Sequence, residues 1–273
     1  MRTWLFVPGH DARKMRKALE SEAEVVVIDW EDGVPPDRKH EARSTTASLL
    51  AAFGGESPRR LVRVNSARDP YFVDDMAAMA QVPVSAVMLP KVEDPQEVAD
   101  LAHLLEKPVI PLLESALGIE RAFDVAHAHP NVERLAFGSL DFLLDLGVQW
   151  EPDNPACRYA QARISVAGRA AGLQGSIDSV YPQLDDQEGL RRDALAARAL
   201  GFTGKLLLHP AQIAPVREVF TPSPEELAQA RAIVQAFEEA RARGEAVVRL
   251  GGAFIDPPVV KRAQNVLAMD NAG

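Results

Sequence analysis

The sequence has one cysteine, Cys157, among its 273 residues. A single thiol excludes disulfides within the chain and metal sites built from several cysteines, and we expect it to be a small buried apolar residue. Long apolar runs are also missing. The run from Trp4 to Val7 is too short for a signal peptide, and no run approaches the roughly 20 residues that span a membrane. We therefore expect a cytoplasmic protein without membrane contacts.

The chain also lacks an excess of basic charge, because 30 Lys and Arg stand against 39 Asp and Glu and the formal net charge is −9. Nucleic-acid binding normally requires a basic surface, so this class of partner is not expected. An anionic small ligand would instead need a local group of Arg, Lys or backbone N–H donors. Apolar residues are plentiful at 47%, which predicts a folded chain with a large core.

Short runs rich in Val, Ile and Leu recur at βα-unit spacing, 22 to 41 residues apart, with helix-like segments between them. Continuous apolar runs of this kind are typical of parallel strands that are covered on both faces. The pattern predicts a TIM (β/α)8 barrel, with a doubly wound open sheet as the alternative. The runs are centred near Leu5, Val27, Val62, Val87, Ile110, Ala136, Ile177 and Leu207.

The predicted organisation is a catalytic barrel over residues 1–220 and a C-terminal extension over residues 221–273. The extension begins with a long helix, because Ser223, Pro224 and Glu226 form a capping-box sequence. We expect it to be a lid-like segment that packs on the barrel or on a neighbouring subunit.

Polar or ionisable residues follow nearly every predicted strand. The strands of a TIM barrel end at one mouth, where active sites lie. Each residue alone could be a helix cap or part of an ion pair, but so many charges at one rim require a ligand or a metal to organise them. They are His10, Glu31, Asp32, Arg63, Asn65, Lys91, Glu93, Glu114, Asp141, Asp178 and His209.

Glu114 and Asp141 end neighbouring predicted strands, so their carboxylates could bind one cation. Oxygen ligands without cysteine favour Mg²⁺ over Zn²⁺. Arg63 ends another strand and has the planar fork that suits a substrate carboxylate. The alternative is that all three serve as caps and salt bridges. In the turn after the sixth strand, Ser139 is the expected helix cap and Asp145 a structural acid.

Several motifs together identify a resemblance: "TWLFVPG", "VVVIDWEDGVPPDRKHEAR", "LVRVNS", "VMLPKVE", "PLLESALGI", "FGSLDF", "GFTGKLLLHPAQI" and "GGAFIDPPVVKRAQNVL". The chain resembles the citrate lyase beta-subunit-like family, part of the group that holds malyl-CoA, citramalyl-CoA and citryl-CoA lyases. The resemblance runs from Thr3 to about Leu267. It implies a trimeric or hexameric TIM barrel.

The resemblance also implies roles for single residues. Mg²⁺ would be held by Glu114 and Asp141, Arg63 would bind the carboxylate of the keto acid, and Glu114 would border that substrate. The segment that begins at Phe6 would contact the CoA thioester, with Arg13 as a phosphate-binding cation. The alternative for Arg13 is a solvated position on a helix face.

In relatives, the extension covers a neighbouring subunit, and the residue that matches Asp256 acts there as acid or base. The alternative is a turn residue before a proline. This chain departs from the family at His10 and Trp30, which we expect to reshape the thioester approach. Its extension is also shorter than in malyl-CoA lyases.

The implied reaction is Mg²⁺-dependent retro-Claisen cleavage of a citryl-CoA-like thioester to a 2-keto acid such as oxaloacetate and an acyl-CoA. Glu31 and Asp32 would support catalysis at the rim, although Asp32 could simply form a turn. Lys91 would either pair with these acids or contact the substrate. Alternatives are a malyl-CoA, citramalyl-CoA or hydroxymethylglutaryl-type lyase, a thioesterase, or a non-autonomous citrate lyase subunit that needs acyl-carrier and transferase partners.

Overall fold

The computed structural model describes residues 1–55, 57–244 and 247–270. The chain forms two compact units, one from Met1 to Arg217 and one from Glu218 onward. No helix within the described residues is long and apolar enough to cross a membrane.

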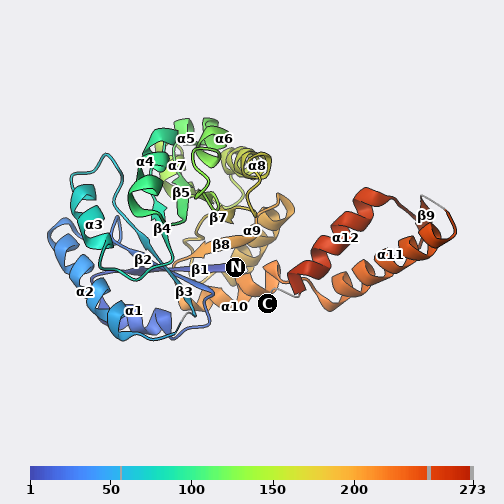
Figure 1. The fold of residues 1–273 in the computed structure, drawn as a ribbon, viewed down its shortest axis with the longest axis horizontal. Helices are drawn as coiled ribbons and strands as arrows, with labels where there is room; N and C mark the ends of the chain where they lie inside the picture. The colour runs from blue at the N-terminus through green and yellow to red at the C-terminus, as the bar shows by residue number, and fades with distance from the viewer. Residues whose placement is uncertain (56, 245–246, 271–273) are drawn as a thin grey trace. The chain divides into compact units, whose positions relative to one another are not determined.

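The first unit is a closed barrel of parallel strands ringed by helices (Figure 1). Each strand pairs with the next in sequence, and the last pairs with the first. The TIM barrel prediction is therefore confirmed, and the open-sheet alternative is wrong. The strands are β1 (Thr3–Pro8), β2 (Val25–Asp29), β3 (Arg59–Arg63), β4 (Ala86–Leu89), β5 (Val109–Leu113), β6 (Ala136–Phe137), β7 (Ile177–Asp178) and β8 (Gly204–Leu207).

Helices follow the strands along the chain and cover the outside of the barrel (Figure 1). They are α1 (Ala12–Leu19), α2 (Lys39–Ala52), α3 (Phe72–Met79), α4 (Pro95–Leu105), α5 (Ala116–Glu120), α6 (Ala122–Ala126), α7 (Ser139–Asp145), α8 (Pro155–Ala170), α9 (Gln187–Ala199) and α10 (Ile213–Phe220).

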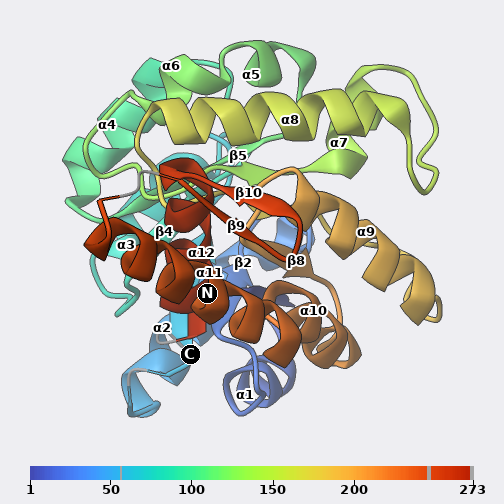
Figure 2. The ribbon, with the colours of Figure 1, turned by 90° about the vertical axis from the view of Figure 1, so that its right-hand side faces the viewer.

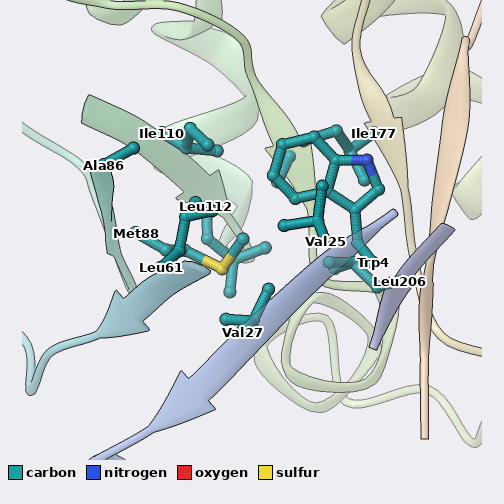
Figure 3. Close-up of a cluster of buried hydrophobic side chains, with 11 residues drawn as sticks. Trp4, Val25, Val27, Leu61, Ala86, Met88, Ile110, Leu112, Ile177 and Leu206 are labelled. Carbon is teal, nitrogen blue, oxygen red and sulfur yellow. The ribbon is translucent and has the colours of Figure 1, made fainter. Parts of the chain in front are cut away.

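Alternate residues of the strands fill the barrel interior (Figure 3). Trp4 of β1, Leu112 of β5 and Leu206 of β8 belong to this interior cluster. The intervening residues face the surrounding helices, so that both faces of strands such as β2 are fully buried. This two-residue period decides which side chains at the strand ends reach the mouth.

The expectation that Asp178 faces the mouth is wrong. Ile177 of β7 belongs to the interior cluster, so Asp178, the next residue, lies on the outer face of the strand. Its carboxylate is fully buried and contacts Lys205 of β8 at 2.5 Å and Gln161 of α8 at 2.7 Å. Lys205 also pairs with Asp193 of α9. This ion-pair network joins barrel and helices.

The second unit contains a helical pair, α11 (Pro224–Ala242) and α12 (Pro257–Asp270), which run side by side (Figure 2). Between them in sequence lie the antiparallel strands β9 (Val248–Leu250) and β10 (Ala253–Ile255). The predicted capping box is present, because Ser223 Oγ accepts from the Glu226 N–H while Glu226 accepts from the Ser223 N–H.

Candidate active site

A cavity of about 410 Å³ lies at the carboxyl ends of the barrel strands. Of the predicted site residues, Phe6, Asp32, Arg63, Glu114 and Asp141 line it together. Strands contribute most of the lining at their ends. Most of these residues come two positions after a residue of the barrel interior, because alternate residues of a strand point to the same side. These are Pro8, Asp29, Arg63, Glu114, Gly138 and Leu208, with Ser179 two positions after Ile177.

The two halves of the cavity differ in polarity. Asp29, Arg63, Glu114 and Asp141 come from β2, β3, β5 and the start of α7. The other half is mainly apolar, formed by residues of β1, β8 and the segment after β7: Phe6, Val7, Val180, Leu206 and Leu208. A ligand of this cavity would meet charged groups on one side and an apolar wall on the other.

Glu114 follows β5 and is buried, and its Oε1 accepts a hydrogen bond from the Lys91 N–H at 2.7 Å. Gly138 makes room for this side chain, because a Cβ at residue 138 would lie 2.5 Å from Glu114 Oε2. Burial raises the pKa of Glu114 well above its usual value, Asp141 and Glu31 raise it further, and Arg63 acts in the opposite direction. A bound cation would offset much of the free energy that burial and the neighbouring acids cost the ionised Glu114 carboxylate.

Asp141 lies in the first turn of α7, next to the end of β6. The sequence interpretation of its neighbour was wrong. Ser139 is the first helical residue, Gly138 occupies the cap position, and Ser139 makes no capping bond. Asp145 is the structural acid that was expected, because its Oδ2 accepts from the Ala116 N–H at 2.8 Å.

The two acids fit a magnesium ion. Mg²⁺ keeps several waters and usually takes only one or two protein carboxylates. Within the described residues, no group of three or more His, Cys, Asp or Glu side chains could hold a metal. A pair of carboxylates beside an open cavity is thus the kind of donor set that Mg²⁺ uses, while a closed Zn²⁺ cage is not formed there.

Arg63 is fixed by two acids from the end of β2. Its Nε and Nη2 each donate to the Asp29 carboxylate at 2.7 Å, and its Nη1 lies 2.9 Å from Glu31 Oε2. The guanidinium lies over the Phe6 ring, 4.8 Å from the ring centre. Desolvation opposes its charge, but Asp29, Glu31 and Glu114 outweigh it and raise the pKa of Arg63.

Lys91 forms ion pairs with both acids of the turn after β2. Its Nζ donates to Glu31 and lies 3.2 Å from Asp32. The Lys91 backbone has φ of 55°, a left-handed conformation that is uncommon for a residue with a side chain. In this conformation the Lys91 N–H donates to Glu114. Lys91 therefore contacts Glu114 through its backbone, and Glu31 and Asp32 through its side chain.

Sequence reasoning missed two residues that build this turn. Asp29 accepts the Glu31 N–H at 2.9 Å and the Gly33 N–H at 2.8 Å. Lys39 is buried, and its Nζ donates to the Trp30 and Glu31 carbonyls at 2.7 and 2.8 Å. The one available signal for Asp29 was its place two residues after an interior position.

Lys39 is held in turn by Asn65, whose Oδ1 accepts from Lys39 Nζ at 2.7 Å. The Asn65 side chain also donates to Asp75, which pairs with Arg43 at 2.7 Å. Asn65 therefore belongs to a buried support behind the turn and not to the mouth.

Trp30 does not line the cavity: its ring is fully buried, and its Nε1–H donates to Thr46 Oγ1 at 3.0 Å. The ring packs against the turn after β1, where a Cβ at residue 9 would lie 2.7 Å from it. His10 and Arg13 are not among the residues that line the cavity, and Arg13 is exposed on α1. His209 caps the short helix that starts at Pro210.

Asp256 lies in the second unit, directly before α12. Its Oδ1 accepts from the Val259 N–H at 3.1 Å, so this half-buried carboxylate caps the helix.

The chain is similar to known proteins over most of its length. The family model described as HpcH/HpaI aldolase/citrate lyase matches residues 2–210. The mitochondrial citramalyl-CoA lyase of Rattus norvegicus is 36% identical over 98% of this chain and 85% of that protein. The citrate lyase subunit beta of Leuconostoc mesenteroides subsp. cremoris is 32% identical over 99% of this chain and 93% of its own length.

A solved structure extends the likeness to the whole chain. It is the CitE protein of Mycobacterium tuberculosis in complex with magnesium, acetoacetate and coenzyme A. The TM-score is 0.87 at 30% sequence identity, and the match covers 99% of this chain and 98% of that one.

Proposed function

Because the chain belongs to the HpcH/HpaI aldolase/citrate lyase family, we propose that it is a carbon–carbon lyase that cleaves a 3-hydroxyacyl-CoA thioester. The products are a 2-keto acid and an acyl-CoA. The observation that carries the proposal is that Arg63, Glu114 and Asp141 line one cavity at the barrel mouth. They are a carboxylate-binding cation and a pair of metal-binding acids.

Arg63 binds the substrate carboxylate next to the hydroxyl-bearing carbon. A guanidinium has five N–H donors, and Arg63 uses two of them on Asp29, while its Nη1 pairs with Glu31 by charge at 2.9 Å without a hydrogen bond. The N–H groups that Asp29 does not take are the proposed donors to one substrate carboxylate. Because Asp29 and Glu31 fix the fork, the scissile bond is held in one orientation, which is how positioning accelerates cleavage.

Glu114 and Asp141 hold Mg²⁺ in this proposal. When bound, the metal acts as a Lewis acid that lowers the pKa of the substrate hydroxyl and stabilises charge on the oxygen that becomes the ketone. A magnesium-bound relative of similar fold supports this assignment.

Cleavage requires a base for the hydroxyl proton and an acid for the carbon of the enolate. The electrons of the broken C–C bond move into the thioester, which becomes an enolate until a proton is added at carbon. Asp256 of a neighbouring subunit is the proposed donor of that proton, as the family resemblance implies. The proposed acceptor of the hydroxyl proton is a water held by Glu31 and Asp32, which pair with Lys91 beside the cavity.

The thioester partner is coenzyme A. The segment from Phe6 to Lys14 is the proposed contact, with Phe6 in the cavity wall and Arg13 facing a phosphate. The CitE structure with bound coenzyme A supports this choice of ligand. A homotrimer or hexamer is the proposed assembly, which light scattering would test.

The favoured substrate is citryl-CoA, with oxaloacetate as the keto acid. Citramalyl-CoA is the nearest alternative, since a citramalyl-CoA lyase is among the similar proteins. Malyl-CoA and hydroxymethylglutaryl-type thioesters are others, and a thioesterase would use the same enolate before hydrolysis. A second candidate is a citrate lyase subunit that needs acyl-carrier and transferase partners, favoured by the likeness to a citrate lyase subunit beta.

A panel of CoA thioesters tests these possibilities. The purified chain with Mg²⁺ is incubated with citryl-, citramalyl-, malyl- and hydroxymethylglutaryl-CoA, and 2-keto acid, acyl-CoA and free thiol are quantified. Keto acid and acyl-CoA in equal amounts support a lyase, and free thiol supports a thioesterase. Absence of keto acid from every ester contradicts the stand-alone lyase and favours the subunit.

A further inference from the structure

Ser139 and Ser179 form a buried hydroxyl pair in the cavity wall. Their Oγ atoms lie 2.7 Å apart, and the Ser139 N–H donates to Ser179 Oγ at 2.8 Å. Both residues line the cavity, and their exposed fractions are only 5% and 4%. The pair joins the turn that carries Asp141 to the end of β7.

Among the described residues, one hydrogen of this pair has no acceptor. The two hydroxyls carry two hydrogens, and the single bond between their oxygens uses one of them, whichever serine donates. In the part of the chain that the structure describes, neither hydroxyl donates to a third group. A buried donor left unpaired is unfavourable, so an oxygen of a cavity ligand is its natural partner.

The place of the pair in the barrel indicates which ligand oxygen this is. Arg63 ends β3 and Ser179 follows β7, four strands further round a closed ring of eight, so the two face each other across the mouth. Glu114 and Asp141 lie between them, at β5 and after β6. A substrate with its carboxylate on Arg63 and its hydroxyl at the two acids would direct its far end toward the serines.

We propose that the Ser139–Ser179 pair donates a hydrogen bond to the thioester carbonyl oxygen of the substrate. This rests on the proposed lyase function. When the C–C bond breaks, its electron pair moves toward this oxygen and creates the enolate. A donor already fixed in a buried wall stabilises that charge without reorganisation.

The experiment compares wild type, Ser139→Ala, Ser179→Ala and the double variant on the thioester that the wild type cleaves. Each single variant keeps one hydroxyl that can face the substrate, so we expect a small loss. The double variant removes both hydroxyls, and we expect kcat to fall about 100-fold, the usual cost of one oxyanion donor. Ser176→Ala is the matched control, because this buried serine precedes β7 and does not line the cavity.

Two further measurements separate this role from a structural one. Exchange of the acyl-CoA α-hydrogens in D₂O, followed by NMR, reports enolate formation and should fall with kcat. Keto-acid affinity, measured by calorimetry with Mg²⁺, should stay at the wild-type value, because Arg63 and the two acids are untouched. An equal loss of keto-acid affinity would mean that the serines only position Asp141, and would overturn the proposal.

Full kcat in the double variant would also overturn it while leaving the lyase function intact. By contrast, a wild type that cleaves no thioester and exchanges no α-hydrogen would contradict the proposed function itself.

Discussion

The carboxylate of Asp29 holds the guanidinium of Arg63 in a two-point contact, with Nε–Oδ1 and Nη2–Oδ2 distances of 2.7 Å each. The same two oxygens accept the Glu31 and Gly33 N–H groups. One buried carboxylate therefore orients both the cation that binds the substrate and the acidic turn beside it. Burial alone would raise the pKa of Asp29, but Arg63 and the two N–H donors outweigh this and lower it.

Replacing Asp29 with Asn should destabilise the fold by about 3–5 kcal/mol at neutral pH, because it leaves a buried arginine charge without its main partner. The contribution has a defined pH dependence. A lowered carboxyl pKa gives stability that is present above the unfolded value of about 3.9 and is lost as the pH falls through the folded value. The difference between wild type and Asp29→Asn in urea unfolding should therefore shrink on acidification below about pH 4.

Asp153→Asn is the matched control, since Asp153 forms an exposed ion pair with Arg158 at 2.6 Å. Exposed pairs contribute only about 0–1 kcal/mol, so little change is expected. A loss in Asp29→Asn that is no larger than in this control would show that the contact does not stabilise the fold.

The metal assignment gives a second prediction. Glu114→Ala and Asp141→Ala should each abolish Mg²⁺-dependent turnover and leave the circular dichroism spectrum unchanged. Removal of Mg²⁺ with EDTA should have the same effect on the wild type, and added Mg²⁺ should restore activity. Asp145→Ala, four residues along the same helix, should retain turnover because, among the described residues, its carboxylate accepts a hydrogen bond from the Ala116 N–H alone. Full activity in either of the first two variants would exclude that acid as a ligand.

The strands could be predicted because the signal for each lies within its own few residues. The run Val25–Asp29 is buried on both faces, and it is correspondingly rich in Val and Ile. Whether a residue at a strand end faces the barrel mouth depends on its place in the two-residue period of the strand. This period directs Glu114 to the mouth and Asp178 to the outer face. Glu114 stands two residues after interior Leu112, whereas Asp178 directly follows interior Ile177. Both are acids at the end of an apolar run, so residue type alone predicted that both would lie at the mouth.

Other contacts depend on partners far away in sequence. Arg63 meets Asp29 across 34 residues, and Lys39 meets Asn65 across 26. No local pattern distinguishes a lysine that supports a turn from a lysine on a solvated helix end. Ser139 was misassigned for a related reason, since a serine before a helix normally caps it, but here Ser179 is its partner.

The buried Lys39 gives a third prediction. Lys39→Met keeps the length of the side chain but removes its hydrogen bonds to the Trp30 and Glu31 carbonyls. The turn should then hold Glu31, and through it Arg63, less firmly. We expect kcat/KM to fall about 10- to 100-fold, the range found when groups that support site residues are removed. Calorimetry should show weaker keto-acid binding.

Lys205→Met is the control for loss of a buried lysine, because Lys205 is fully buried but pairs with Asp178 and Asp193 outside the cavity. It should lower the free energy of unfolding without weakening keto-acid binding, when both variants are measured well below their melting temperatures. If both variants lose keto-acid affinity equally, the effect of Lys39→Met comes from general destabilisation and not from the turn.

The final prediction concerns Asp256, to which the contacts and the proposed mechanism give different roles. Its carboxylate caps α12 through the Val259 N–H, and the proposed mechanism also uses it as the acid that protonates the enolate carbon. Asn caps a helix as well as Asp does, whereas Ala costs about 1 kcal/mol. Asp256→Asn therefore keeps the cap and removes only the acid. If Asp256 is the acid, Asp256→Asn should lower kcat by about 10²- to 10⁴-fold with an unchanged melting temperature. If it is only a cap, Asp256→Asn should turn over like the wild type, and only Asp256→Ala should melt earlier.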